Sequence, residues 1–278
     1  PAVLQDILDA IRNFVAVHGT NLLRYLELST TLTASEGYGG IGARVFWKPI
    51  ATSLMSQHPN LFVPGIPDRF QLNYTRCIEF INHIESVICF SETSSEAFRS
   101  EPSFVEFIRK WQLAAYFSIR QRTVVQSVES TLASAAGHGN VATLLPSSMP
   151  QSEGAAAVKT ARRSAGTSAA RRPFDVRSAK DGFLTIEATV IYRAMSWCWD
   201  DSIFIGQLAS RFWRLFVQLA LRYSQYLVDH PAPVAEDGAA ATTTSSDSAA
   251  AEGVRQMAVR LHDVGLFVTK CRDLFDTM

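Results

Sequence analysis

The chain has 278 residues, of which 47% are apolar and 19% are charged, so it can bury a sizeable core and is not a disordered tail. Its 26 basic residues equal its 26 acidic residues, which excludes a global charge that would attract nucleic acid or an anionic membrane. The four cysteines lie far apart and no signal peptide opens the sequence, so we expect a reducing, cytosolic compartment without a disulfide framework.

Hydrophobic periodicity predicts an all-α fold. The first apolar stripe runs from Leu4 to Val15 at spacings of three and four residues, as on one face of an amphipathic helix. A second helix should begin near Asp68, after the turn residues 64–67, and a third should run from Ser103 to Leu132. No alternating run predicts a β-sheet. We therefore expect an elongated bundle of long antiparallel amphipathic helices with disordered loops.

Composition divides the chain into five segments. Residues 1–132 should form the first helical part, and residues 133–178, which are rich in Ala and Ser, a disordered basic loop. Residues 179–230 should hold a central helical hairpin region. Residues 231–252 should form a disordered acidic loop, and residues 253–278 the C-terminal helix.

A glycine motif at Gly37, Gly39 and Gly42 matches the fingerprint of dinucleotide-binding loops. That fingerprint requires a preceding strand, a following helix and an acidic residue about 20 residues downstream. Residues 21–28 instead indicate the end of a helix, and no acid lies at the downstream position. We interpret Gly37–Gly42 as a connection between helices, and a nucleotide-binding enzyme is the less favoured alternative.

The basic loop permits another alternative. Its cations outnumber its acids: Lys159, Arg162, Arg163, Arg171, Arg172 and Arg177 against Glu153 and Asp175. The simpler interpretation is a solubilising insertion. The alternative is a membrane-surface adaptor that binds acidic lipids, since each basic residue near such a surface contributes about 1 kcal/mol.

Tests for catalytic chemistry and metal binding give no site. Cys77, His83 and Cys89 point to three sides of one helix at 100° per residue, so they cannot share a metal ion. The adjacent pair Asp200 and Asp201 precedes an apolar run, which favours capping of a helix N-terminus over catalysis. The sequence therefore predicts no enzyme, no cofactor and no metal.

The stretch that follows is the richest in apolar residues. They cover most of the circumference of the predicted helix, so most of it should lie inside a bundle. A narrow polar stripe remains, at Arg211, Arg214, Gln218, Arg222 and Gln225. In the simpler interpretation its arginine stems pack on neighbours while the guanidiniums reach water; the alternative is a docking stripe for an acidic partner helix. These charges also exclude a membrane span here.

Three ordered blocks carry a family resemblance. They are residues 61–81, 110–130 and 198–227, which contain a P-G-x-P-D turn, a K-W-x-L-x-x-Y-F-x-x-R helix, and C-W-x-D followed by R-x-W-x-L-x-x-Q-x-x-x-R-Y. In order and spacing they resemble the C-terminal half of the second subunit of the conserved oligomeric Golgi complex. The motif residues to which we assign structural or interaction roles are Pro64, Gly65, Pro67, Asp68, Trp111, Tyr116, Phe117, Arg120, Trp199, Asp201, Arg211, Trp213, Gln218, Arg222 and Tyr223.

The resemblance implies a vesicle-tethering function. The family is part of a non-catalytic tether of helical rods that acts in retrograde intra-Golgi transport. It implies other subunits of the complex as partners, with SNAREs, Rab GTPases and golgins as further partners. It also implies a peripheral position on the cytoplasmic face of the Golgi membrane.

Overall fold

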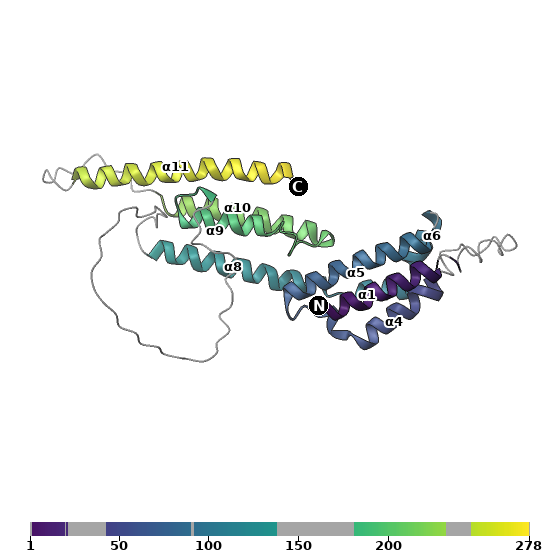
Figure 1. Ribbon diagram of the computed structural model, residues 1–278. Coiled ribbons are helices and arrows are strands. Elements are labelled where there is room, and N and C mark those ends of the chain that lie inside the picture. Colours follow the sequence, from purple (N-terminus) through teal and green to yellow (C-terminus); the bar gives the residue numbers. More distant parts are fainter. Residues whose placement is uncertain are drawn as a thin grey trace, which may run out of the picture. The chain divides into compact units, whose positions relative to one another are not determined.

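The computed structural model describes residues 2–19, 21, 43–89, 92–137, 181–231 and 246–277. Within these ranges the chain is helical and has no β-strand element (Figure 1), so the all-α prediction is confirmed. The chain divides into two compact units. The first comprises Pro1–Arg120 and Asp200–Arg211, and the second comprises Gln121–Trp199 and Phe212–Met278.

The first unit is built around α5 (Pro67–Ile88). This helix begins as predicted: Ile66 is extended, Pro67 occupies the first helical position, and Asp68 lies in the first turn, where the helix dipole favours negative charge. Helix α1 packs on α5. The other elements of this unit are α1 (Ala2–Phe14), η1 (Val15–Gly19), η2 (Ala43–Trp47), α4 (Lys48–Gln57), η3 (Pro59–Phe62), α6 (Glu92–Ser100) and α7 (Pro102–Lys110).

The third predicted helix is in fact two helices. Helix α7 ends at Lys110 and α8 (Leu113–Gly137) begins after a short break. At the break Trp111 is extended, with φ −68° and ψ 116°, and the backbone N–H of Gln112 donates to the carbonyl of Phe62. The prediction of one continuous helix was wrong because these tertiary contacts override helix propensity.

The second unit contains the later part of α8 together with α9 (Ile186–Trp197), most of α10 (Ala209–Asp229) and α11 (Ser246–Thr277). Helix α11 packs on α9. It begins at Ser246, inside the predicted acidic loop, because residues 249–251 are all alanine, the strongest helix former. Residues 138–180 and 232–245 lie outside the described residues. Among the described helices, none combines the length and the hydrophobicity that a membrane span requires.

Residues 198–205 form turns, so the helix predicted at Asp200 begins only after η5 (Gly206–Leu208). The carboxylate of Asp200 accepts hydrogen bonds from the backbone N–H of Ser202, at 2.8 Å, and from its hydroxyl. The prediction that Asp200 caps a helix was wrong, because a hydrogen bond to its own backbone two residues on closes a local turn instead.

One face of α10 is buried. It consists of Phe212, Leu215, Phe216, Leu219, Tyr223 and Tyr226. On the opposite side Leu221 is 62% exposed and Val228 is 73% exposed. The prediction that most of this helix lies inside a bundle was therefore wrong, because an apolar circumference leads to burial only where neighbouring elements cover it.

Candidate interaction site

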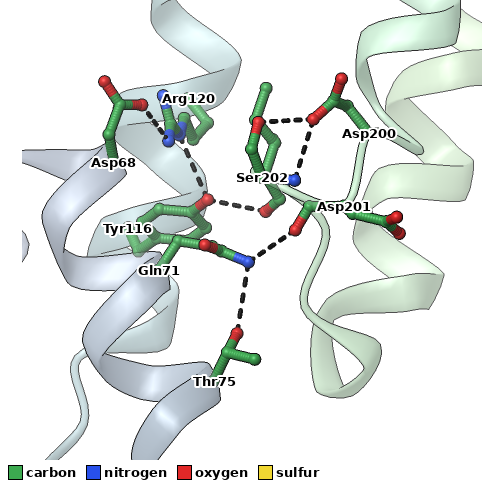
Figure 2. Close-up of polar contacts among 9 residues, drawn as sticks. Asp68, Gln71, Thr75, Tyr116, Arg120, Asp200, Asp201 and Ser202 are labelled. Carbon is green, nitrogen blue, oxygen red and sulfur yellow. Dashed lines mark hydrogen bonds and ion pairs between the residues drawn. The ribbon is translucent and has the colours of Figure 1, made fainter. Parts of the chain in front are cut away.

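Motif residues that are distant in the sequence meet at one junction in the first unit (Figure 2). Arg120 of α8 is only 8% exposed, and its guanidinium donates to the carboxylate of Asp68 at 2.6 Å and to the hydroxyl of Tyr116 at 3.2 Å. The Tyr116 hydroxyl donates in turn to the carbonyl of Ile203 at 2.7 Å. This chain of hydrogen bonds joins the start of α5, helix α8 and the turn after α9.

A second contact fixes the same turn. The amide of Gln71 donates to the carbonyl of Asp201 at 2.7 Å and to the hydroxyl of Thr75 at 3.2 Å. The carboxylate of Asp201 points away from Gln71 (Figure 2). Asp201 therefore joins the junction through its backbone, although the sequence motif marked it as an acidic residue.

Electrostatics at the junction favour positioning over reaction. Burial raises the pKa of Tyr116, and the neighbouring Arg120 opposes this rise only in part. The hydroxyl thus stays protonated at neutral pH and can donate to Ile203. Tyr116 and Gln71 donate to backbone carbonyls, and Arg120 donates to Asp68 and Tyr116. The arrangement therefore stabilises three chain segments and presents no activated nucleophile.

Replacing Tyr116 by phenylalanine should lower the free energy of unfolding by about 1–2 kcal/mol, because the buried carbonyl of Ile203 loses its side-chain donor. Urea unfolding measures the change. Tyr74→Phe is the matched control: Tyr74 is also buried, and its hydroxyl has no hydrogen bond among the described residues. An equal loss in both variants would contradict the assigned role of Tyr116.

The aromatic motif residues occupy different environments. In the first unit Trp111 is 4% exposed and Phe117 is 8% exposed, so both belong to the core. In the second unit Trp199 lies 6.2 Å from Trp213, ring centre to ring centre, and Trp213 is 38% exposed. Tyr223 is buried, with its ring centre 4.9 Å from that of Phe267.

Two arginines of the polar stripe predicted on α10 contact other parts of the chain. Arg222 forms a bidentate ion pair with Glu129 of α8, at 2.7 and 3.0 Å. Arg211 places its guanidinium 6.0 Å from the ring centre of Phe117. Arg214 and Gln218 are exposed. These contacts agree with the interpretation in which the arginines pack on neighbouring residues, and the docking stripe stays a prediction.

The Glu129–Arg222 pair should make a small acid-sensitive contribution. The hydrogen bond from Arg222 lowers the pKa of the Glu129 carboxyl below its ordinary value. Because the folded pKa is depressed, the stabilisation is present above the unfolded pKa of about 4.3 and is lost as the pH falls through the lower folded value. Both side chains are more than a third exposed, at 37% and 46%, so the contribution should be a few tenths of a kcal/mol.

Glu129→Gln tests this dependence. The difference in unfolding free energy between the wild type and the variant should shrink as the pH is lowered from about 6 to 3. Glu106→Gln, on an exposed residue of α7, serves as the control. A difference that grows on acidification would show that the pKa shift has the opposite sign.

Sequence reasoning missed a buried carboxylate in the second unit. Asp263 of α11 has no exposed surface, and it accepts from the backbone N–H groups of Leu184 and Thr185, both at 2.8 Å, and from the Thr185 hydroxyl at 2.6 Å. Thr185 is the N-cap of α9, so Asp263 completes the start of α9 from another helix. The sequence does contain a signal for it. Asp263 lies four residues after the apolar Val259 and four before the apolar Phe267, so it falls on the same helical stripe as these two residues.

Two of the cysteines behave as apolar core residues. Burial raises the pKa of Cys77 and of Cys198 to about 12, so both thiols are protonated at neutral pH. In the described part of the chain no three His, Cys, Asp or Glu residues gather where they could hold a metal ion. The glycine motif Gly37–Gly42 and the basic residues Lys159–Arg177 lie outside the described residues.

Comparison with known proteins relates the chain to one family. The family model described as "COG complex component, COG2, C-terminal" matches residues 109–278. Conserved oligomeric Golgi complex subunit 2 of Homo sapiens is 27% identical over 233 residues, which are 82% of this chain and 26% of that protein. The protein of the same name from Arabidopsis thaliana is 24% identical over 224 residues, 80% of this chain and 24% of that protein.

The Drosophila melanogaster protein of that name is 22% identical over 230 residues, 82% of this chain and 27% of that protein. The chain thus spans about a quarter of the length of these relatives. No solved structure matches it. Because the family model covers more than half of the chain, including the Trp111 and Trp213 motifs, the chain belongs to the family of the C-terminal region of COG2, a component of the COG complex.

Proposed function

We propose that this protein is a subunit of a multisubunit Golgi vesicle-tethering complex that acts in retrograde intra-Golgi transport. The observation that carries the proposal is the family match over residues 109–278, together with relatives from several organisms that share one subunit name. The helical architecture supports it, since helices joined by positioning contacts suit a non-catalytic scaffold that works through protein contacts.

On this proposal the partners are the other subunits of the complex, with SNAREs, Rab GTPases and golgins as further partners. The protein acts at the cytoplasmic face of the Golgi membrane, where it is held peripherally. Weak contacts of several subunits with one vesicle then accumulate through avidity, so strong capture needs no single tight site.

The motif residues divide into two proposed roles. Asp68, Tyr116 and Arg120 position the helices that carry the binding surfaces, as the hydrogen bonds from the buried Arg120 to the other two suggest. Trp213 and Gln218, which are exposed, are available for contact with a partner.

Affinity purification of the tagged full-length protein from its own cells tests the proposal. We expect the other subunits of the complex to be recovered in stoichiometric amounts, as measured by quantitative mass spectrometry against a tag-only control. Cross-linking of the purified assembly should then place residues of this region next to named subunits. Recovery of none of these subunits above the control would refute the proposal.

A further inference from the structure

An apolar groove runs along α1 in the first unit. Three open hollows, of about 550, 400 and 380 Å³, lie along the side of α1 that faces α4. The first two share Ile7, and the last two share Ile11 and Ile50, so the hollows form one groove. Its lining residues on α1 extend from Leu4 to Phe14. At 1.5 Å per residue this corresponds to about 15 Å, or roughly three turns of a helix.

Large apolar side chains remain exposed at both ends of the groove. Phe14 and Val45 are 58% and 49% exposed at one end, and Val63 and Ile66 are 50% and 61% exposed at the other. The side of α1 that packs on α5 is distinct, because Leu8 is only 1% exposed. A contiguous exposed apolar surface of this kind typically marks a binding site for another protein segment.

The charge of the groove is asymmetric. No Asp or Glu lines it in the described part of the chain, and its two basic side chains, Arg69 and His58, lie near the 64–67 turn. Arg69 is exposed and forms no ion pair among the described residues. At the same end Asn73 is 6% exposed, and its Oδ1 has no hydrogen-bond partner in the part of the chain that the structure describes. This end therefore complements a carboxylate and a hydrogen-bond donor, while the other end is apolar.

We propose that the groove binds an amphipathic helix of a partner protein, about three turns long, with its N-terminus at Arg69. The first turn of a helix has free backbone N–H groups and favours acidic side chains, so it supplies both a donor and a carboxylate to the polar end. The apolar stripe of the helix then covers Ile7, Ile11 and Phe14. This inference goes beyond the tethering function and does not depend on the Golgi assignment.

Fluorescence anisotropy with two designed peptides tests the charge and the orientation. Both are three-turn helices with leucines at the a and d positions; one has two glutamates in its first turn, and the other has two lysines there. The purified chain should bind the glutamate peptide at least about tenfold more tightly, since one charge-assisted hydrogen bond accounts for such a factor. Arg69→Glu should reverse this preference. Equal binding of the two peptides overturns the proposal.

Exposed positions supply the variants that test the apolar lining without disturbing the core. Phe14→Glu and Ile66→Glu should each weaken binding of the glutamate peptide by about tenfold or more. The matched control is Val105→Glu, because Val105 is 41% exposed on α7 and does not line the groove. Circular dichroism confirms that each variant is folded. Loss of binding in the Val105→Glu control to the same degree overturns the assigned site.

A photo-cross-linker placed at Ile50 in the assembled native complex identifies the occupant. Cross-links to a segment of another protein that has an apolar stripe and an acidic N-terminal turn support the proposal. Cross-links to a second copy of this chain, or to its own residues 22–42, overturn it by showing a different occupant. Co-purification of the complex is measured in a separate experiment. A negative cross-linking result would therefore contradict the groove proposal but not the tethering function.

Discussion

Replacing Asp263 by alanine should lower the free energy of unfolding of the second unit by about 3 kcal/mol. The change removes a buried carboxylate that accepts three hydrogen bonds at the start of α9, and it leaves two backbone N–H groups and a hydroxyl without this acceptor. Charge-assisted hydrogen bonds are about twice as strong as neutral ones, so the loss should exceed that of an ordinary cap. Urea unfolding measures the change in free energy.

Amide hydrogen exchange locates the effect of this substitution. The amides of Leu184 and Thr185 should lose protection, because both donate to Asp263. Asp263→Asn retains one acceptor oxygen and should have a smaller effect, while Asp276→Ala, at an exposed position of α11, should change the stability little. Unchanged protection of the two amides in Asp263→Ala would disprove the capping role.

Helix type and several helix starts could be predicted because their signals are local. The start of α5 is one example: Pro67 fixes the backbone, and the apolar residues that follow recur at three and four positions. The hydrophobic periodicity of such a segment depends only on its own residues and not on the position of the rest of the chain. The same reasoning led to the all-α prediction, which is confirmed.

Helix breaks could not be predicted in this way, because distant residues stabilise them. The break at Trp111 depends on the carbonyl of Phe62, and the turn at 200–203 depends on donors from Gln71 and Tyr116. No pattern within either stretch reveals these partners. The motif correctly marked the turn that contains Asp201. However, the contact there is made by the backbone carbonyl of Asp201, and a sequence does not show which backbone groups form contacts.

The candidate groove was also beyond sequence reasoning. It is lined by residues of α1, α4 and the turn before α5. The sequence of each of these segments, taken by itself, is that of an ordinary amphipathic surface. Exposure separates the two apolar sides of α1, since Leu8 is buried and Phe14 is exposed. A hydrophobic stripe predicts that a helix packs against something, while the three-dimensional arrangement determines how much of the stripe remains open.

Trp111 and Trp213 are both motif residues, but they differ in burial, at 4% and 38% exposed. Trp111 lies within the aromatic core, with the ring centres of Phe62, Phe70 and Tyr74 at 5.0, 5.3 and 5.1 Å. Trp111→Ala should lower the free energy of unfolding of the first unit by about 4 kcal/mol, because it removes a large buried side chain and leaves a cavity that neighbouring rings cannot fill completely. Urea unfolding and the loss of near-ultraviolet circular dichroism measure this change.

Trp213→Ala is the matched control, because Trp213 is 38% exposed. The Trp213 ring centre lies 5.4 and 5.1 Å from those of Phe216 and Phe275, so its removal should lower the free energy of unfolding, but by about 1–2 kcal/mol and not by 4. Trp111→Phe should recover part of the loss at the buried site. If both alanine variants were equally destabilised, the exposed ring would have to be as well packed as the buried one, and Trp213 would no longer be available for contact with a partner.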